Sequence, residues 1–185
     1  MMPEYRGINQ HRQQGISLIE ITAVVAILAI IAGVALPDLG SGSDGRKLDL
    51  AAKEVAEAIR FARAEAIRTS MDHGVIFDEN NETVKVYSLP AGTPKYDVYH
   101  PIDKKLYSLD LNTAPLTAGV DLLSYSIDFG SGPGSGYLGF NSNGNPKFSF
   151  FGTDYMLKSA AITLSNAGQT RIINVSPMTG RVTVQ

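Results

Sequence analysis

The feature that most constrains this chain is an uninterrupted apolar stretch over residues 16–36, in which Glu20 is the only ionisable residue. A helix rises 1.5 Å per residue, so this stretch would be about 31 Å long, close to the roughly 30 Å hydrocarbon core of a bilayer. Few helices of soluble proteins are apolar on every side. The stretch therefore predicts a membrane-length helix, and a helix buried in a soluble core is the weaker alternative.

The segment before this stretch, residues 1–15, is polar and carries Arg6 and Arg12. Basic residues that precede a span favour a cytoplasmic N-terminus. An ordinary secretory signal has its small-residue cleavage site after the apolar stretch, and residues 37–41 match that pattern poorly. Here the small residue at the junction, Gly15, comes before the stretch. An ordinary signal peptide is therefore a weak interpretation.

Glu20 requires a physical reason for its position. A carboxylate at the centre of a membrane helix costs about 2.5 to 3.5 kcal/mol, and less near an end, so it marks a functional group whose partner should be identified. Cleavage after Gly15 would give Ile16 a new α-amine, four residues before Glu20. That cation could pair with Glu20 of the same chain or of a neighbouring chain. The alternative is that Glu20 lies in the headgroup layer with no specific partner.

The segment Gly15-Ile16-Ser17-Leu18-Ile19-Glu20 resembles the leader junction of type IV prepilins and pseudopilins. In that family a small residue precedes the cut, an apolar residue becomes position one and a glutamate becomes position five. Pro37, which would be residue 22 of the processed chain, resembles the helix-bending proline of the family. Ile16 replaces the commoner phenylalanine and keeps the position apolar.

This resemblance implies that prepilin peptidase cuts between Gly15 and Ile16 and methylates the new Ile16 amine. It implies that Glu20 sets the register of one subunit against another in a filament. It also implies that the helix over residues 16–37 anchors the chain in the bacterial inner membrane, with the C-terminal domain in the periplasm. Removal of the leader, residues 1–15, leaves 14 basic and 17 acidic residues, a net charge of −3.

After the apolar stretch, the sequence predicts a break and then a second helix. Residues 38–45 are rich in glycine and follow Pro37, and both residue types disfavour helix. Residues 46–71 return to helical periodicity and predict an amphipathic helix packed on its own sheet. Its apolar stripe is formed by Leu48, Ala52, Val55, Ile59, Ala62 and Ala66.

The remaining residues, 72–185, predict a globular domain of antiparallel β-structure, because short β-prone runs alternate with turn residues. A first hairpin is expected from 75–77 and 84–87, further strands over 125–129, 137–140 and 147–151, and a three-stranded meander from 161–164, 170–175 and 181–184. Residues 88–124 are expected to be loops with a short strand near 105–109. The predicted fold class is α+β, in which a long N-terminal hydrophobic, pilin-like helix is followed by an amphipathic helix packed on antiparallel β-sheet.

Three further strings narrow the resemblance. They are EAIRFARAEAIR in the amphipathic helix, FNSNGNPKF over residues 140–148, and TGRV near the C-terminus. In this order they resemble H-type minor pseudopilins of type II secretion and their FimT-like pilus relatives. The resemblance covers nearly the whole chain and implies a structural subunit.

Composition and motifs argue against several other functions. The 16 basic and 18 acidic residues give a net charge of −2, so nothing in the charge predicts a nucleic-acid binder. The chain has no cysteine, and His73 and His100 do not have metal-ligand spacing. GSGPGSG does not lead into GK[ST], so it is a linker and not a phosphate-binding loop. We expect no enzymatic activity, no metal and no cofactor.

Three functional hypotheses remain from the sequence. The first is a minor pseudopilin at or near the filament tip, with prepilin peptidase, other pseudopilins or pilins, and a secreted protein substrate as partners. The second is a FimT-like type IV minor pilin in pilus assembly or DNA uptake. DNA is the less expected partner because Lys158, Arg171 and Arg181 are sparse cations. The third is a single-span anchored protein whose leader is never cut.

Overall fold

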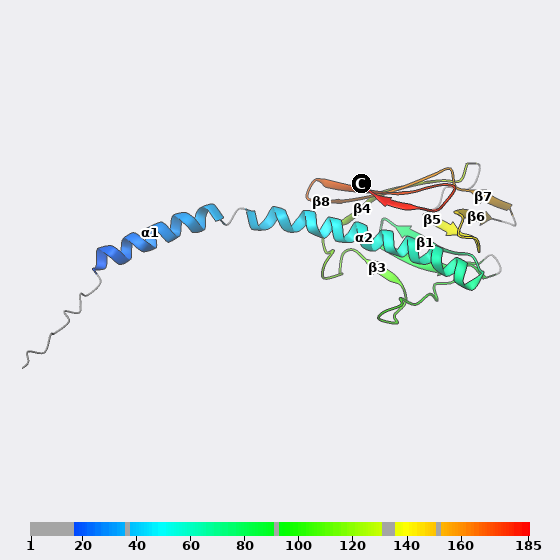
Figure 1. The fold of residues 1–185 in the computed structure, drawn as a ribbon, viewed down its shortest axis with the longest axis horizontal. Coiled ribbons are helices and arrows are strands. Elements are labelled where there is room, and N and C mark those ends of the chain that lie inside the picture. The colour runs from blue at the N-terminus through cyan, green and yellow to red at the C-terminus, as the bar shows by residue number, and fades with distance from the viewer. Residues whose placement is uncertain (1–16, 36–37, 91–92, 131–135, 151–152) are drawn as a thin grey trace, which may run out of the picture. The chain divides into compact units, whose positions relative to one another are not determined.

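The computed structural model of the protein describes residues 17–35, 38–90, 93–130, 136–150 and 153–185. The chain divides into two units, Met1–Ser41 and Gly42–Gln185. Helix α1, Leu18–Ala35, lies in the first unit, and most of helix α2, Asp38–Thr69, lies in the second (Figure 1). Each unit is described by itself below.

The second unit combines α2 with strands that pair in antiparallel fashion. One sheet has the order β3-β2-β1-β5, a second has the order β10-β9-β8-β4, and β6 pairs with β7. This arrangement confirms the predicted α+β class. The strand bounds are β1 His73–Asp78, β2 Thr83–Ser88, β3 Ser108–Asp110, β4 Asp121–Asp128, β5 Tyr137–Phe140, β6 Lys147–Phe150, β7 Thr153–Met156, β8 Ser159–Asn166, β9 Gln169–Val175 and β10 Val182–Val184.

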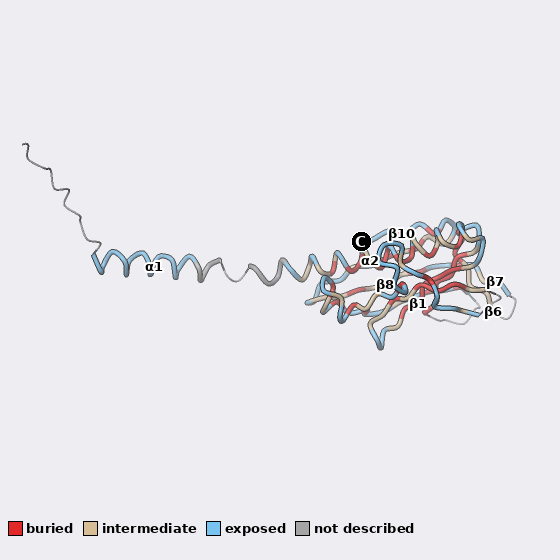
Figure 2. Tube along the Cα trace, turned by 90° about the horizontal axis from the view of Figure 1, so that it is seen from below, coloured by how far each residue is buried: buried red, intermediate tan, exposed pale blue. Residues whose placement is uncertain are grey.

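The core forms where α2 packs against the sheets, and Figure 2 shows its buried positions in red along the inner side of the helix. Alanines dominate this side, so the helix can approach the strands closely. The strands contribute larger side chains, among them Phe140, Leu138 and Ile162, each fully buried. The predicted stripe is confirmed, because all six of its residues are fully buried. Three further alanines of this helix are also fully buried: Ala51, Ala56 and Ala58.

The start of α2 differs from the expectation. The helix begins at Asp38 and not at residue 46, so it includes the glycine-rich segment 38–45 where we expected a break. Within the second unit, contacts with the β8–β9 hairpin hold the helix from Asp44 onward: Asn166 Nδ2 donates to the Asp44 carbonyl oxygen at 3.3 Å, and Arg171 Nε lies 2.7 Å from Asp49 Oδ1. A Cβ at Gly45 would lie 3.1 Å from Gln169 Oε1, so the glycine allows this close approach. At Asp44 and Gly45, tertiary contacts therefore offset the low helix propensity of glycine.

The strand predictions were correct where the pairing is local. The β1–β2 hairpin and the β8–β9–β10 meander are present, and β3, Ser108–Asp110, overlaps the end of the short strand expected near 105–109. Sequence patterns missed β7 and the first half of β4. They also gave no sign that β4 and β5, on either side of the GSGPGSG segment, belong to different sheets. β4 pairs with β8, whereas β5 pairs with β1.

The three strings that carry the H-type resemblance meet at Arg63 and Arg60 of α2. Arg63 Nε donates to the Gly144 carbonyl oxygen at 2.9 Å, and a Cβ at Gly180 would lie 3.0 Å from the same nitrogen. Arg60 Nη2 donates to the Val182 carbonyl oxygen at 3.2 Å. Gly144 and Gly180 both have positive φ, 75° and 63°, a conformation that glycine adopts at little cost. The two arginines thus join the 140–148 loop and the C-terminal strand to the helix.

Replacement of Arg63 by leucine should destabilise the second unit by about 1 to 2 kcal/mol, because the Gly144 carbonyl oxygen loses its donor in a part-buried position. Chemical denaturation of the purified protein measures this change. Arg46→Leu is the matched control, since Arg46 is exposed on the same helix and should change stability by no more than about 0.5 kcal/mol. Equal stability of the two variants would contradict the role given to Arg63.

Candidate functional site: the apolar helix α1

The most unusual surface of the described protein is the helix α1. Its large apolar side chains are between 52% and 80% exposed, although side chains of this kind are normally buried. A continuous exposed apolar surface marks a place where another protein or a membrane covers it. The exposed apolar side chains of α1 must therefore be covered by a protein or membrane surface that is not part of its own unit. The exposed residues are Leu18, Ile19, Ile21, Val24, Val25, Ile27, Leu28, Ile30 and Ile31.

A membrane span was expected over residues 16–37. Among the residues that the structure describes, no helix has the length and apolar character needed to cross a membrane. Residues 16, 36 and 37 of the expected span lie outside the described part of the chain.

Glu20 lies in the first turn of α1, and its side chain is exposed. Its backbone N–H donates to the Ser17 carbonyl oxygen at 3.0 Å, which begins the helix. A carboxylate in this turn interacts favourably with the partial positive charge at a helix N-terminus, typically by about 0.3 to 1 kcal/mol. α1 contains no lysine, arginine or histidine, so a full counter-charge for Glu20 must come from outside the helix.

The other predicted site residues cannot be placed beside Glu20. Gly15 and Ile16, the expected cleavage and methylation site, and Pro37, the expected helix-bending residue, lie outside the described residues. Their roles remain predictions from the sequence.

The acid-rich turn between β1 and β2 has a structural use. Asp78 Oδ1 accepts the backbone N–H groups of Asn80 and Asn81, and Asn81 Nδ2 donates to Asp78 Oδ2 at 2.6 Å. These bonds lower the pKa of Asp78, and the largest contribution comes from the side-chain amide of Asn81. Glu82 Oε2 accepts the backbone N–H of Leu122 at 2.5 Å, so this turn also caps the edge of β4.

The two histidines also have local roles. His73 is buried, and its Nδ1 lies 3.0 Å from the Met71 carbonyl oxygen. The His100 ring packs edge-on against Tyr107, with ring centroids 4.7 Å apart. Over the described ranges, no group of three or more His, Cys, Asp or Glu side chains is arranged to hold a metal ion.

One of the three cations considered for DNA binding already has a protein partner. Arg171 Nε lies 2.7 Å from Asp49 Oδ1, so this guanidinium is an internal link between β9 and α2. Such a pair weakens the attraction of Arg171 for a phosphate backbone.

An exposed apolar helix, followed by a helix packed on antiparallel sheets, defines a pilin-like protein. Residues 51–179 match the family model of the type II transport protein GspH, and residues 10–36 match the prokaryotic N-terminal methylation motif. The chain therefore belongs to the GspH family of type II transport proteins. This is a family of pseudopilin and pilin structural subunits, so the protein is a filament subunit and not an enzyme.

Solved structures support this fold. The minor pseudopilin EpsH from the type 2 secretion system of Vibrio cholerae is similar in two structures, each at 15% identity and a TM-score of 0.50. Both matches cover 75% of this chain, and they cover 96% and 92% of the EpsH chains. The type IV minor pilin FimU of Pseudomonas aeruginosa matches at 17% identity and a TM-score of 0.47, over 75% of this chain and 87% of FimU. Comparison with curated protein sequences gave no match.

Proposed function

We propose that the protein is a minor pseudopilin of a type II secretion system, located at or near the tip of the periplasmic pseudopilus, where it helps to start assembly and contacts other minor subunits or an exported protein. The observation that carries this proposal is the exposed apolar surface of α1 in a chain whose residues 51–179 match GspH. A surface of this kind is stable in the core of a filament, where the same helices of neighbouring subunits cover it.

Before assembly, the helix over residues 16–37 holds the subunit in the inner membrane as a single span. Arg6 and Arg12 keep the short N-terminal segment in the cytoplasm, and the second unit lies in the periplasm. Support comes from the methylation-motif match over residues 10–36, which includes Arg12 and the apolar stretch.

Prepilin peptidase removes residues 1–15, and the Ile16 amine is then methylated. The new amine is a cation at the start of a helix whose first turn contains the carboxylate of Glu20. In a low-dielectric surrounding, an unpaired carboxylate is costly, so an incoming subunit is held at the register in which Glu20 meets an amine. Pro37 supplies the bend at the end of this helix.

Mass spectrometry of the N-terminus of protein purified from the native host tests this proposal. We expect a chain that begins at Ile16 with a methylated amine. Expression in a strain without prepilin peptidase is the control and should give a chain that retains residues 1–15. Native protein that begins at Met1 would exclude processing and leave a single-span anchored protein.

A further inference from the structure

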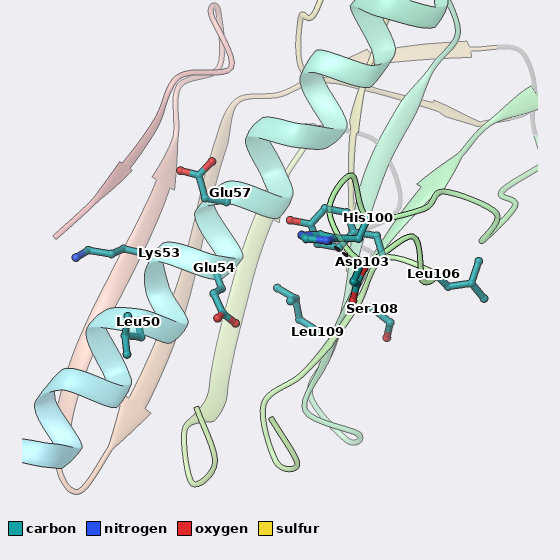
Figure 3. Close-up of a pocket in the computed structure, with 10 residues that line it drawn as sticks. Leu50, Lys53, Glu54, Glu57, His100, Asp103, Leu106, Ser108 and Leu109 are labelled. Carbon is teal, nitrogen blue, oxygen red and sulfur yellow. Dashed lines mark ion pairs between the residues drawn. The ribbon is translucent and has the colours of Figure 1, made fainter. Parts of the chain in front are cut away.

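A groove lies along α2, on the side of the segment 100–109, for which the sequence predicts a loop and a short strand. Its volume is about 430 Å³. Figure 3 shows its two walls: α2 contributes one, and the segment from His100 to Leu109 contributes the other. Residues of both walls belong to the second unit, so this groove is complete within it.

The wall opposite α2 is held firmly. The Tyr107 N–H donates to the Val98 carbonyl oxygen at 2.8 Å, and the His100 N–H donates to the Lys105 carbonyl oxygen at 2.7 Å, so residues 98–107 form a hairpin. The Tyr107 ring contacts the ring of Phe61 on α2, with centroids 5.0 Å apart, and the ring of His100, with centroids 4.7 Å apart. These ring contacts join the hairpin to α2.

The charges that face the groove are mainly negative. Glu54 points from α2 toward Leu109 (Figure 3), and the groove lining also includes one lysine, Lys53. Asp103 lies on the hairpin wall, 3.1 Å from His100 Nδ1. Glu57 lines the groove but is paired with Arg60 at 2.6 Å. Burial, and after it the carboxylates of Glu57 and Glu54, raise the pKa of the Tyr107 hydroxyl to about 12.

Apolar side chains are exposed beside these carboxylates. Leu50 on α2 is 38% exposed, and Leu106 on the hairpin is 53% exposed. Ile102, at the hairpin tip, is 84% exposed. The groove therefore combines an apolar lining with acidic groups on both walls, Glu54 on one and Asp103 on the other.

We propose that this groove docks a segment of a neighbouring, different filament subunit that presents a lysine or arginine beside an apolar side chain. The long stem of such a cation packs on Leu50 and Leu106 while its charged end lies between Glu54 and Asp103. The negative charge of the groove and the positive charge of the docked segment are complementary. The processed chain carries a net charge of −3, which favours a different subunit over a second copy. This inference rests on the proposed function.

The chain has no cysteine, so a single introduced cysteine can carry a photo-crosslinker at one defined position. We would place a maleimide–benzophenone label on Leu106→Cys in the full-length chain, incorporated into pseudopili in its own host. Leu123→Cys is the matched control, because Leu123 is 58% exposed on β4, in the other sheet. The expected adduct from Leu106→Cys is a pilin-like subunit, labelled within a few residues of a lysine or arginine. Leu123→Cys should not give this adduct.

Charge reversal sharpens the test. Glu54→Lys should lower the yield of the Leu106→Cys adduct by about tenfold, because attraction becomes repulsion. Asp121→Lys, the same change of charge at an exposed residue of β4 in the other sheet, should change the yield less than about twofold. Thermal melting checks that both variants fold, and Glu54→Gln replaces Glu54→Lys if the latter does not.

Two results would overturn the docking proposal while leaving the proposed function intact. One is normal incorporation of Leu106→Cys with no more adduct than Leu123→Cys. The other is an adduct that maps to a second copy, a lipid, a secreted protein or an acidic segment. Failure of the unmodified chain to enter any pseudopilus would instead refute the proposed function.

Discussion

Glu20→Ala should lower incorporation into the pseudopilus by at least about tenfold while membrane association is retained. The substitution makes the apolar helix more apolar, so insertion does not suffer. Assembly suffers because the amine of an adjacent subunit loses its partner in a low-dielectric surrounding, and breaking a buried ion pair costs about 3 to 5 kcal/mol. Tenfold corresponds to only about 1.4 kcal/mol, so the expected effect exceeds this threshold. Separating detergent-extracted pseudopili from unassembled membrane protein and comparing the amount of this subunit in the two fractions measures the ratio.

Two variants separate charge from shape at this position. Glu20→Gln keeps the size of the side chain and should incorporate as poorly as Glu20→Ala. Thr22→Ala removes only a local hydrogen bond, from Thr22 Oγ1 to the Ile19 carbonyl oxygen at 2.9 Å, and should incorporate normally. Wild-type incorporation of Glu20→Gln would show that the carboxylate has no part in assembly.

Gly74→Ala should destabilise the second unit by about 3 kcal/mol, at the upper end of the usual cost of overpacking. A Cβ at this position would collide with the Tyr87 hydroxyl and would lie 2.5 Å from the Leu138 carbonyl oxygen. Tyr87 is fully buried, and Leu138 belongs to the adjacent strand β5, so neither can move away cheaply. Thermal melting should show a decrease in Tm of roughly 10 °C.

Gly168→Ala is the control for this prediction. Gly168 lies in the β8–β9 turn with a φ of 79°, and a Cβ there would meet nothing within 4 Å. Its cost is therefore the strain of a left-handed alanine, about 1 kcal/mol. A loss at Gly74 no larger than the loss at Gly168 would show that the sheet accommodates the added methyl group.

The parts of the fold that the sequence predicted are those set by local periodicity. The stripe from Leu48 to Ala66 has the 3.6-residue period of a helix, and its burial follows from the apolar content of one face. The hairpin from β1 to β2 and the meander from β8 to β10 could be predicted because turn-forming residues, namely asparagine, glycine and proline, lie between their strands.

Long-range pairing could not be predicted in this way. The separation of β4 and β5 into different sheets depends on partners far along the chain, and the helical segment at Asp44 is bonded to the distant β8–β9 hairpin. The groove beside Tyr107 lies in a segment without periodicity, and only its apolar residues, such as Ile102 and Leu106, distinguished it from an ordinary polar loop.

The functional residues show the same contrast between what local sequence predicts and what depends on long-range contacts. Glu20 could be singled out from one charge in an apolar sequence, because the cost of that charge is a general property of membranes. The convergence of Gly144 and Val182 on the arginines of α2 has no counterpart in local patterns, since the hydrogen bonds join residues about 80 and 120 positions apart.

These long-range bonds have a consequence for biogenesis. The first helix of the globular unit is bonded to residues close to the end of the chain, through Arg60 and Val182 and through Asp49 and Arg171. In the proposed topology, in which the second unit crosses the membrane N-terminal end first, this helix lacks its partners until β9 and β10 have crossed. We therefore expect the second unit to complete its folding only after these strands reach the periplasm, and until then the helix is available to chaperones or proteases at the membrane.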